Sequence, residues 1–269
     1  MTEKMTIPEI VSRIPRGALL VLHASFKPAR DEGIAPRQML EMLMDRLGPD
    51  GTLMLPTFTY CYADIWKPAA YDPAQTPGLE NGILSETFRK MPGVRRSGNP
   101  TYSVAVWGRY ADLLTVGSAD DAGLGHGSSY ENANRLGAKI LLFHVGNNRN
   151  SMLHYAEAAS GIPYNDIPFR ACWGTDALTV HGRMKLNGEF PACSEGFSRF
   201  DDVFVREGFA ERLGSGSFLI DSPAMVDYVC KAIEQTPDLM LCRDVTCEPC
   251  TLRRKRLAER GYLDKLEYR

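Results

Sequence analysis

A histidine and a glutamate lie three residues apart in the stretch NSMLHYAEAASGIPY, residues 150–164. Ser151 is a natural helix N-cap and Gly161 a natural stop, so the stretch predicts a short helix. His154 and Glu157 then lie on the same face of that helix. A carboxylate can fix the tautomer of a neighbouring imidazole, so the pair is a candidate general base with its orienting group. The alternative is a structural histidine and a solvated helix charge.

Two apolar runs end beside polar residues that could serve the same chemistry. The runs ALLVLHASF (18–26) and AKILLFHVG (138–146) both predict buried strands. In α/β sheets, ligands gather at the carboxyl ends of strands. His23 and Ser25 lie at the C-terminal end of the first strand, and His154 follows the second. We therefore expect these three side chains to converge.

The elements around these residues predict an α/β protein. A helix expected over 36–48 separates the strand at 18–26 from another strand at 51–58. Its apolar residues form one stripe, with Pro36 at its start and Gly48 at its end. This order is a βαβ unit, so the two strands should be parallel with a right-handed crossover.

The rest of the chain alternates short strands and helices. Further strands are expected at 103–108, 138–146, 177–182, 184–190 and 216–221, and helices at 82–91, 151–160, 200–208 and 222–235. The fold class is α/β, with a mixed, partly parallel central sheet. We expect a single domain over residues 1–269 with a cysteine-containing C-terminal extension at about 237–269. The Gly- and Pro-rich segments 60–100 and 123–137 predict functional loops.

Composition excludes several classes of protein. The chain has 269 residues, of which 44% are hydrophobic, and a formal net charge of −2. A nucleic-acid partner is not expected, because phosphate binding needs a concentrated positive field. No apolar run is long enough to cross a bilayer, and the N-terminal residues show no secretory signal. We therefore expect a cytoplasmic protein with no membrane partner; the oligomeric state stays open.

Missing motifs narrow the chemistry. The chain contains no G-x-x-x-x-G-K-[ST], no H-E-x-x-H and no G-x-S-x-G. The usual signatures of phosphate hydrolysis, zinc proteolysis and elbow-type esterases are thus absent. The stretch GLGHG (123–127) does not open a helix after a strand, so it predicts a ligand-lining loop rather than a dinucleotide site.

The cysteines favour no disulfide framework. Their number is seven, an odd count without a secretory signal. The stretch CRDVTCEPC places Cys242, Cys247 and Cys250 in a C-x4-C-x2-C pattern, with Cys230 upstream. A structural zinc needs four ligands, and no second C-x2-C pair exists. We expect no metal site here, and interpret these residues as reduced cysteines near a turn.

Five ordered motifs resemble those of the aminoglycoside 3-N-acetyltransferase family. That family's pattern runs H-S-S, G-P-x-G-T-L-x-x-P-T-F, T-P-x-x-x-G-x-L-x-E, R-S-x-H-P and L-H-x-x-E. The corresponding segments here are His23–Ser25, Gly48–Phe58, Thr76–Glu86, Arg96–Pro100 and Leu153–Glu157. The resemblance covers about residues 17–235. It implies an α/β/α fold, acetyl-coenzyme A (acetyl-CoA) as donor, and antibiotic resistance through acetylation of an amine on a small molecule.

The resemblance also implies roles for individual residues. His154 is the expected catalytic base, which fits an imidazole whose unperturbed pKa near ~6.5 lets it take a proton from an amine. Glu157 is the first candidate for its carboxylate partner, and Glu195 in CSEGF is the second. The matched loops predict the following residues as cofactor-binding: His23, Ser25, Thr57, Phe58, Ser97, Asn99, Thr101, Gly125 and Ser128.

Two departures from the family pattern concern the acceptor. Ala24 replaces the second serine of H-S-S, and Asn99 replaces the histidine of R-S-x-H-P. Both positions are expected to border the cleft. A polycationic acceptor needs acidic side chains around it, and candidates in loops are Asp64, Asp72, Glu80 and Asp166.

Three alternatives to an aminoglycoside acetyltransferase stay open. One is a biosynthetic acyltransferase that uses a different amine. Another is a non-catalytic CoA- or ligand-binding protein with the same fold. The last is a zinc-stabilised interaction module at the C-terminus.

Overall fold

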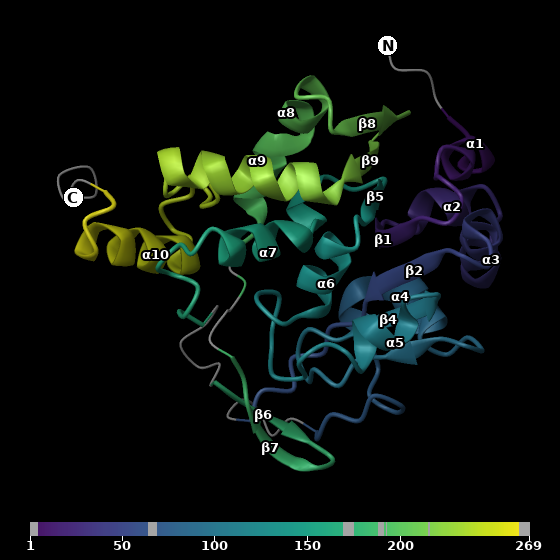
Figure 1. Ribbon diagram of the computed structural model, residues 1–269, viewed down its shortest axis with the longest axis horizontal. Helices are drawn as coiled ribbons and strands as arrows, with labels where there is room; N and C mark the ends of the chain where they lie inside the picture. The colour runs from purple at the N-terminus through teal and green to yellow at the C-terminus, as the bar shows by residue number, and fades with distance from the viewer. Residues whose placement is uncertain are drawn as a thin grey trace.

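The central feature is a sheet of mixed direction, seen in the computed structural model (Figure 1). The structure describes residues 5–63, 69–168, 175–187, 191, 193–214 and 216–263. Within these residues, seven strands follow the order β3–β4–β2–β1–β5–β9–β8. Their bounds are β1 Leu19–Ala24, β2 Thr52–Pro56, β3 Arg95–Arg96, β4 Val104–Gly108, β5 Lys139–Phe143, β8 Ala210–Leu213 and β9 Ser217–Asp221. Strand β1 pairs in parallel with β2 and β5, and the other pairs are antiparallel.

The sheet separates two apolar cores because alternate side chains of a strand point to opposite faces. In β1, Val21 packs into one core while Leu20 and Leu22 pack into the other. In β5, Ile140 and Leu142 pack into the same core as Val21, and Leu141 and Phe143 pack into the other. Near-continuous apolar strands are the expected signature of a sheet covered on both faces. The mixed α/β fold is therefore confirmed, in a three-layer α/β/α arrangement.

The helices divide between the two faces of the sheet (Figure 1). One face is covered by α1 Ile7–Ser12, α2 Lys27–Asp31, α3 Pro36–Leu47 and α4 Gly82–Phe88. The other is covered by α5 Ala111–Thr115, α6 Ser129–Arg135, α7 Met152–Ala159, α8 Phe200–Arg206 and α9 Ser222–Gln235. Helix α10 Glu248–Glu259 joins the same core from one end of the molecule. Short 3-10 helices are η1 Leu79–Asn81, η2 Asn147–Arg149 and η3 Glu195–Arg199. Among the described residues, no helix has both the length and the apolar composition needed to cross a membrane.

The predicted βαβ unit is confirmed. Strands β1 and β2 are parallel neighbours, and α3 lies between them in the chain. Pro36 is the first residue of α3, and Gly48 ends it with a positive φ of 72°. The 123–137 segment differs from the expectation of a loop, because α6 occupies its second half. Ser128 caps that helix by accepting the Glu131 N–H at 3.2 Å.

A small second sheet projects from the main body. It contains β6 Asp176–Thr179 and β7 Gly182–Lys185, which form the expected hairpin. Isolated bridges from Tyr62 to Ala177 and from Tyr71 to Thr179 join it to the long loop after β2. Part of the expected strand at 184–190 lies outside the described residues.

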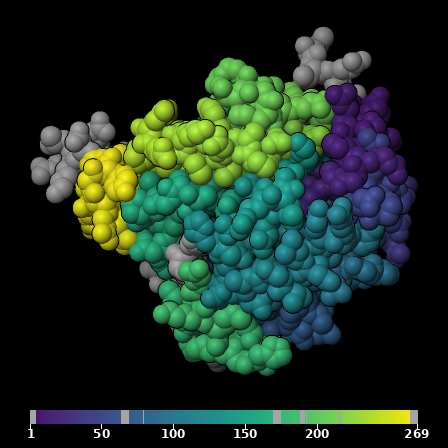
Figure 2. Space-filling model, viewed as in Figure 1, coloured from purple at the N-terminus to yellow at the C-terminus, as the bar shows by residue number. Residues whose placement is uncertain are grey.

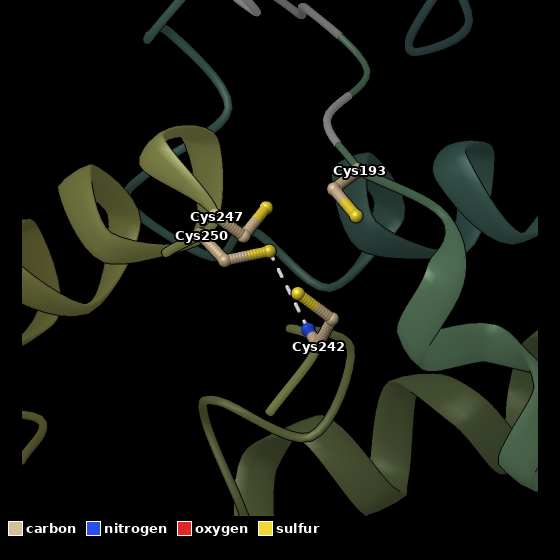
Figure 3. A group of neighbouring side chains, drawn as sticks. All are labelled: Cys193, Cys242, Cys247 and Cys250. Carbon is tan, nitrogen blue, oxygen red and sulfur yellow. Dashed lines mark hydrogen bonds between the residues drawn. The ribbon is translucent and has the colours of Figure 1, made fainter. Parts of the chain in front are cut away.

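The C-terminal segment folds back against the segment around η3. Figure 2 shows α10, in yellow, at one end of the molecule beside the chain that follows α7, and Arg256 of α10 pairs there with Asp166 at 2.8 Å. The approach of the two segments is close at Gly196, where a Cβ atom would lie 2.6 Å from the carbonyl oxygen of Met240. Cys193 thereby meets Cys242, Cys247 and Cys250 (Figure 3).

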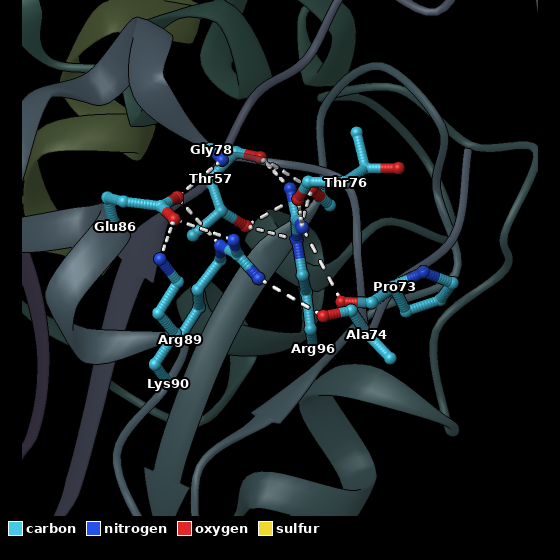
Figure 4. A network of polar contacts seen from close by, with 10 residues as sticks. Thr57, Pro73, Ala74, Thr76, Gly78, Glu86, Arg89, Lys90 and Arg96 are labelled. Carbon is cyan, nitrogen blue, oxygen red and sulfur yellow. Dashed lines mark hydrogen bonds and ion pairs between the residues drawn. The ribbon is translucent and has the colours of Figure 1, made fainter. Parts of the chain in front are cut away.

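A buried ion-pair network holds the loop before α4 against the end of β2 (Figure 4). Glu86 of α4 accepts hydrogen bonds from Arg89 at 2.6 and 2.7 Å and from the Gly78 N–H at 2.8 Å. Arg96 of β3 donates to the Thr57 carbonyl oxygen at 2.7 Å and to the Thr76 carbonyl. The hydrogen bonds from Arg89, chiefly, lower the pKa of Glu86 from 4.5 to about 2.

Replacement of Glu86 tests this network. Because its pKa falls on folding, the carboxylate stabilises the fold above pH ~5, and this contribution is lost as the pH drops toward 2. Glu86→Gln should lower the free energy of unfolding at pH 7 by about 2–3 kcal/mol. The deficit relative to wild type should shrink between pH 5 and the lowest pH at which both proteins fold, as measured by urea titration.

Exposed Glu41, paired with Arg37 on α3, supplies the control Glu41→Gln, for which we expect no measurable change. A pH-independent deficit would contradict the role given to the Glu86 charge.

Candidate active site

The site is built where α7 begins, directly after the carboxyl end of β5. The chain leaves β5, passes through η2 and enters α7 at Met152. The Asn150 side-chain oxygen accepts the Met152 N–H at 3.2 Å. Ser151 is the N-cap residue, as expected, but its hydroxyl makes no capping hydrogen bond. His154 thus lies in the first turn, as the sequence predicts.

Three side chains form a hydrogen-bonded series that ends at His154. Its Nδ1 lies 2.7 Å from Oε2 of Glu157, and the Tyr164 hydroxyl donates to Oε1 of Glu157 at 2.8 Å. A carboxylate accepts hydrogen bonds only, so it holds the proton of the neutral imidazole on Nδ1 and leaves Nε2 as the proton acceptor. The ring of Phe197 packs against the imidazole, with ring centroids 4.8 Å apart. The geometry is that of an oriented general base.

Burial makes the Glu157 carboxylate dependent on its partners. Its side chain is 3% exposed, and an unpaired charge at that depth would cost several kcal/mol. Burial first, and then the negative charge of Glu157, raise the pKa of the Tyr164 hydroxyl well above its usual value. Tyr164 therefore stays neutral and acts as a donor. The guanidinium of Arg253 lies over the Tyr164 ring, with Cζ 5.9 Å from its centroid, and adds positive charge attracted to Glu157.

A cavity of about 950 Å³ opens in front of His154. Its wall comes from the ends of β1 and β2, the loop between β5 and α7, η1, and residues of the segment before η3. His23, Ser25 and His154 all line it, so the expected convergence of the three is found. This volume lies at the upper end of the range for small-molecule sites.

His23 differs from His154 in its surroundings. Its side chain is buried, and its Nε2 has no hydrogen-bond partner among the residues that the structure describes. Burial lowers the pKa of His23 from 6.5 to about 4. The residue is therefore a neutral part of the cavity floor at physiological pH and lacks the carboxylate that orients His154.

The residues predicted to bind the cofactor fall into two groups. His23, Ser25 and Phe58 line the cavity. The other six lie outside its lining and are buried among protein partners: Thr57, Ser97, Asn99, Thr101, Gly125 and Ser128. Thr57, for example, exchanges hydrogen bonds with Ser103 and Arg96. These six residues make contacts within the protein and lie outside the cavity lining, and their part in cofactor binding stays a prediction.

The Asn99 side chain forms hydrogen bonds with four backbone groups, a role that its sequence position did not reveal. Its Oδ1 accepts the N–H groups of Thr101 at 2.9 Å and Tyr102 at 2.6 Å. Its Nδ2 donates to the carbonyls of Asp120 and Ala122 at 2.8 and 2.6 Å. Asn99 therefore ties neighbouring backbone segments together and is not among the residues that line the cavity. The other departure, Ala24, does line the cavity.

Both acidic and basic side chains line the cavity. Glu195 and Glu80 line the cavity, as does Arg149 of η2. Glu195 is exposed, and the described carboxylate bonded to His154 is Glu157. Of the other acidic candidates, Asp72 and Asp166 lie elsewhere, with Asp166 paired to Arg256. Asp64 lies outside the described residues.

Sequence reasoning missed several residues of the wall. Tyr60, Tyr102 and Arg149 line the cavity, and Asn81 lines it while its side chain accepts the Phe58 N–H at 2.6 Å. A usable signal existed for Arg149, since it lies in the polar loop directly before the His154 helix. The two tyrosines come from distant segments, so only the fold could bring them together.

Two bacterial proteins resemble the chain in sequence. Aminoglycoside N(3)-acetyltransferase IV of Salmonella sp. is 30% identical over 149 residues, which is 55% of each chain. Aminoglycoside N(3)-acetyltransferase III of Pseudomonas aeruginosa is 32% identical over 173 residues, covering 59% of this chain and 64% of that protein. The chain thus spans less than two thirds of the length of either relative.

Solved structures share the fold. The aminoglycoside acetyltransferase AAC(3)-IVa, as a histidine-to-alanine mutant in complex with a gentamicin, is 25% identical with a TM-score of 0.75. That match covers 95% of this chain and 99% of the solved one. AAC-IIIb with CoASH is 22% identical with a TM-score of 0.69, covering 87% and 97% of the two chains, and this likeness concerns the fold alone.

The family model described as aminoglycoside 3-N-acetyltransferase matches residues 21–234. This span includes most of β1 and all of β2, β5 and α7, and it contains His23, Phe58, His154 and Glu157. Since the match extends over most of the sequence, the chain belongs to the aminoglycoside 3-N-acetyltransferase family.

Proposed function

We propose that this protein transfers the acetyl group of acetyl-CoA to an amine of an aminoglycoside or a related small molecule. The observation that carries the proposal is the series Tyr164–Glu157–His154, which ends at a cavity of about 950 Å³. Family membership supports the reaction class, and the gentamicin complex of the AAC(3)-IVa mutant supports the acceptor class. The CoASH complex of AAC-IIIb is consistent with the donor.

The reaction needs a neutral amine at the thioester carbonyl. Nε2 of His154 takes a proton from the attacking nitrogen as the new N–C bond forms and the C–S bond of the thioester breaks. The CoA sulfur leaves as a thiolate and accepts a proton, so the products are an N-acetyl amine and free CoA thiol. Glu157 stabilises the imidazolium that forms in between. Direct transfer needs no covalent enzyme intermediate.

Two features of the wall fit the two substrates. Glu80 and Glu195 supply negative charge for a cationic acceptor, and Arg149 supplies positive charge for the phosphates of CoA. Glu195 is thereby proposed as an acceptor-binding residue rather than as the orienting carboxylate. His23, Ser25 and Phe58 remain the proposed donor-binding residues, because they line the cavity at the ends of β1 and β2.

Removal of the base is the first test. His154→Ala should lower kcat about 10²–10⁴-fold, because no other group takes the amine proton, while the melting temperature changes little. CoA-thiol release at saturating substrates measures the rate. His181→Ala, at the exposed turn of the β6–β7 hairpin, is the matched control and should retain wild-type kcat. Near-full activity of the His154 variant would remove this residue from the mechanism.

The orienting role of Glu157 has a separate signature. In Glu157→Gln the amide can donate to Nδ1, which favours the tautomer with the proton on Nε2 and thereby removes the proton acceptor. We expect kcat to fall about 10²–10⁴-fold with KM for the amine nearly unchanged. Tyr164→Phe removes only one hydrogen bond to the carboxylate, so its loss in kcat should be clearly smaller. If Tyr164→Phe lowered kcat as much as Glu157→Gln, the result would contradict the assignment of Glu157 as the group that orients His154.

The acceptor is identified by a panel of amines in the same thiol-release assay. Aminoglycosides with a free 3-amine should give kcat/KM on the order of 10⁴ M⁻¹s⁻¹ or more. Amino sugars, amino acids and polyamines serve as comparison compounds. Ala24 in the cavity lining removes a hydroxyl that could hydrogen-bond a polyhydroxylated substrate. Turnover of another amine alone would favour the biosynthetic acyltransferase instead.

A further inference from the structure

Four cysteines from distant parts of the chain meet beside the candidate active site. Their sulfur atoms all lie within 4.8 Å of one another. Cys193 comes from the segment before η3, Cys242 from the chain after α9, and Cys247 and Cys250 from the start of α10 (Figure 3). None of the described cysteines forms a disulfide. The sequence offered three clustered ligands, and the fold supplies the fourth.

We propose that Cys193, Cys242, Cys247 and Cys250 bind one zinc ion as four thiolate ligands. Tetrahedral zinc with Zn–S distances of about 2.3 Å places its sulfurs about 3.8 Å apart, so the observed cluster needs only a small contraction. Soft thiolates select zinc over magnesium or calcium, and each thiol gives up its proton when the metal binds. The sulfurs lie too close together to enclose an iron–sulfur cluster.

The surroundings suit a negatively charged metal centre. Four thiolates around Zn²⁺ carry a net charge of −2. The Cys242 N–H donates to Sγ of Cys250 at 3.4 Å, the kind of contact that stabilises a ligand sulfur. Arg199 donates to the Leu241 carbonyl at 3.0 Å, and Arg254 donates to the Cys242 carbonyl. Two guanidinium groups are thus held by the backbone that carries one of the ligands.

The C-terminal helix needs such an anchor. The buried residues of α10 are Cys250, Arg253 and Leu257, so one aliphatic side chain and one thiol supply most of its apolar burial. The apolar burial of a single leucine is small against the conformational entropy lost when a 12-residue helix is ordered. A structural zinc site supplies folding free energy directly, because its binding site does not exist in the unfolded chain.

The anchor also holds the wall of the cavity. Cys193 and the next two residues, Ser194 and Glu195, line that cavity. Phe197, two residues beyond Glu195, packs on the imidazole of His154. A metal at Cys193 would therefore fix the segment that shapes one side of the site, while α10 carries Arg253 to Tyr164. The ion has a structural role here and takes no part in the proton transfer.

Metal content of untagged protein tests the proposal. Elemental analysis by mass spectrometry should find about one zinc per chain. Separate Cys193→Ser, Cys242→Ser, Cys247→Ser and Cys250→Ser variants should lose most of it. Cys230→Ser is the matched control, because Cys230 lies on α9 outside the cluster, and it should keep its zinc. The proposal would be overturned if the Cys193 variant kept its zinc, or if the wild-type protein contained no zinc above background.

Measurements on the wild-type chain remain decisive if a serine variant fails to fold. X-ray absorption at the zinc edge should show four sulfur neighbours at about 2.3 Å, and nitrogen or oxygen neighbours would contradict the ligand set. Replacement by Co²⁺ should give the intense visible absorption of tetrahedral cobalt thiolates. Chelation should lower the melting temperature, and added zinc should restore it. Bound iron, or cysteines paired in disulfides by mass analysis of purified protein, would refute the zinc site.

Discussion

The buried carboxylate of Glu157 is the constraint that governs the site. A charge this deep is tolerated only with well-placed partners, and its partners come from three places in the chain. Its own helix provides His154, the following loop provides Tyr164, and α10 provides the charge of Arg253. A shift of any of these elements would leave a buried charge without compensation. The electrostatic cost of such a shift therefore keeps the base, its orienting group and the C-terminal helix in fixed relation.

The parallel part of the sheet decides where this arrangement faces. Strands β1, β2 and β5 end at the same edge because they run in the same direction, and loops that leave that edge form the cavity. The antiparallel strand β4 begins beside the end of β2, and Tyr102, just before β4, also lines the cavity. The ion-pair network of Glu86 and Arg96 then fixes the loop before α4 at the end of β2. The carboxyl ends of the parallel strands thus belong both to the scaffold and to the cavity.

The C-terminal extension has a place in this scheme. One helix, α10, carries Cys250 of the four clustered cysteines and also Arg253, the residue whose charge supports Glu157. The segment that carries Cys193 continues directly into the cavity wall. A zinc ion at this junction would join the cavity wall to the helix that supports the catalytic carboxylate. The stability of the C-terminal segment and the position of His154 would then depend on each other through the zinc ligands and Arg253.

Local spacing along the chain was enough to predict one set of features, and packing between distant segments produced the others. The i, i+3 separation put His154 and Glu157 on one helix face, and the βαβ order made β1 and β2 parallel neighbours. The first outcome follows from helix periodicity, and the second from the rule that a helical crossover joins parallel strands. Asn99, by contrast, resembled a cleft residue by motif position, yet its amide ties two loops together away from the cavity. Cys193 gave no sign in the sequence of belonging with the cysteines near α10, and Tyr164 gave none of bonding Glu157. These contacts join residues that are far apart in the sequence. They depend on how the layers pack and on the paths of the loops, and the spacing of residues along the chain does not reveal either.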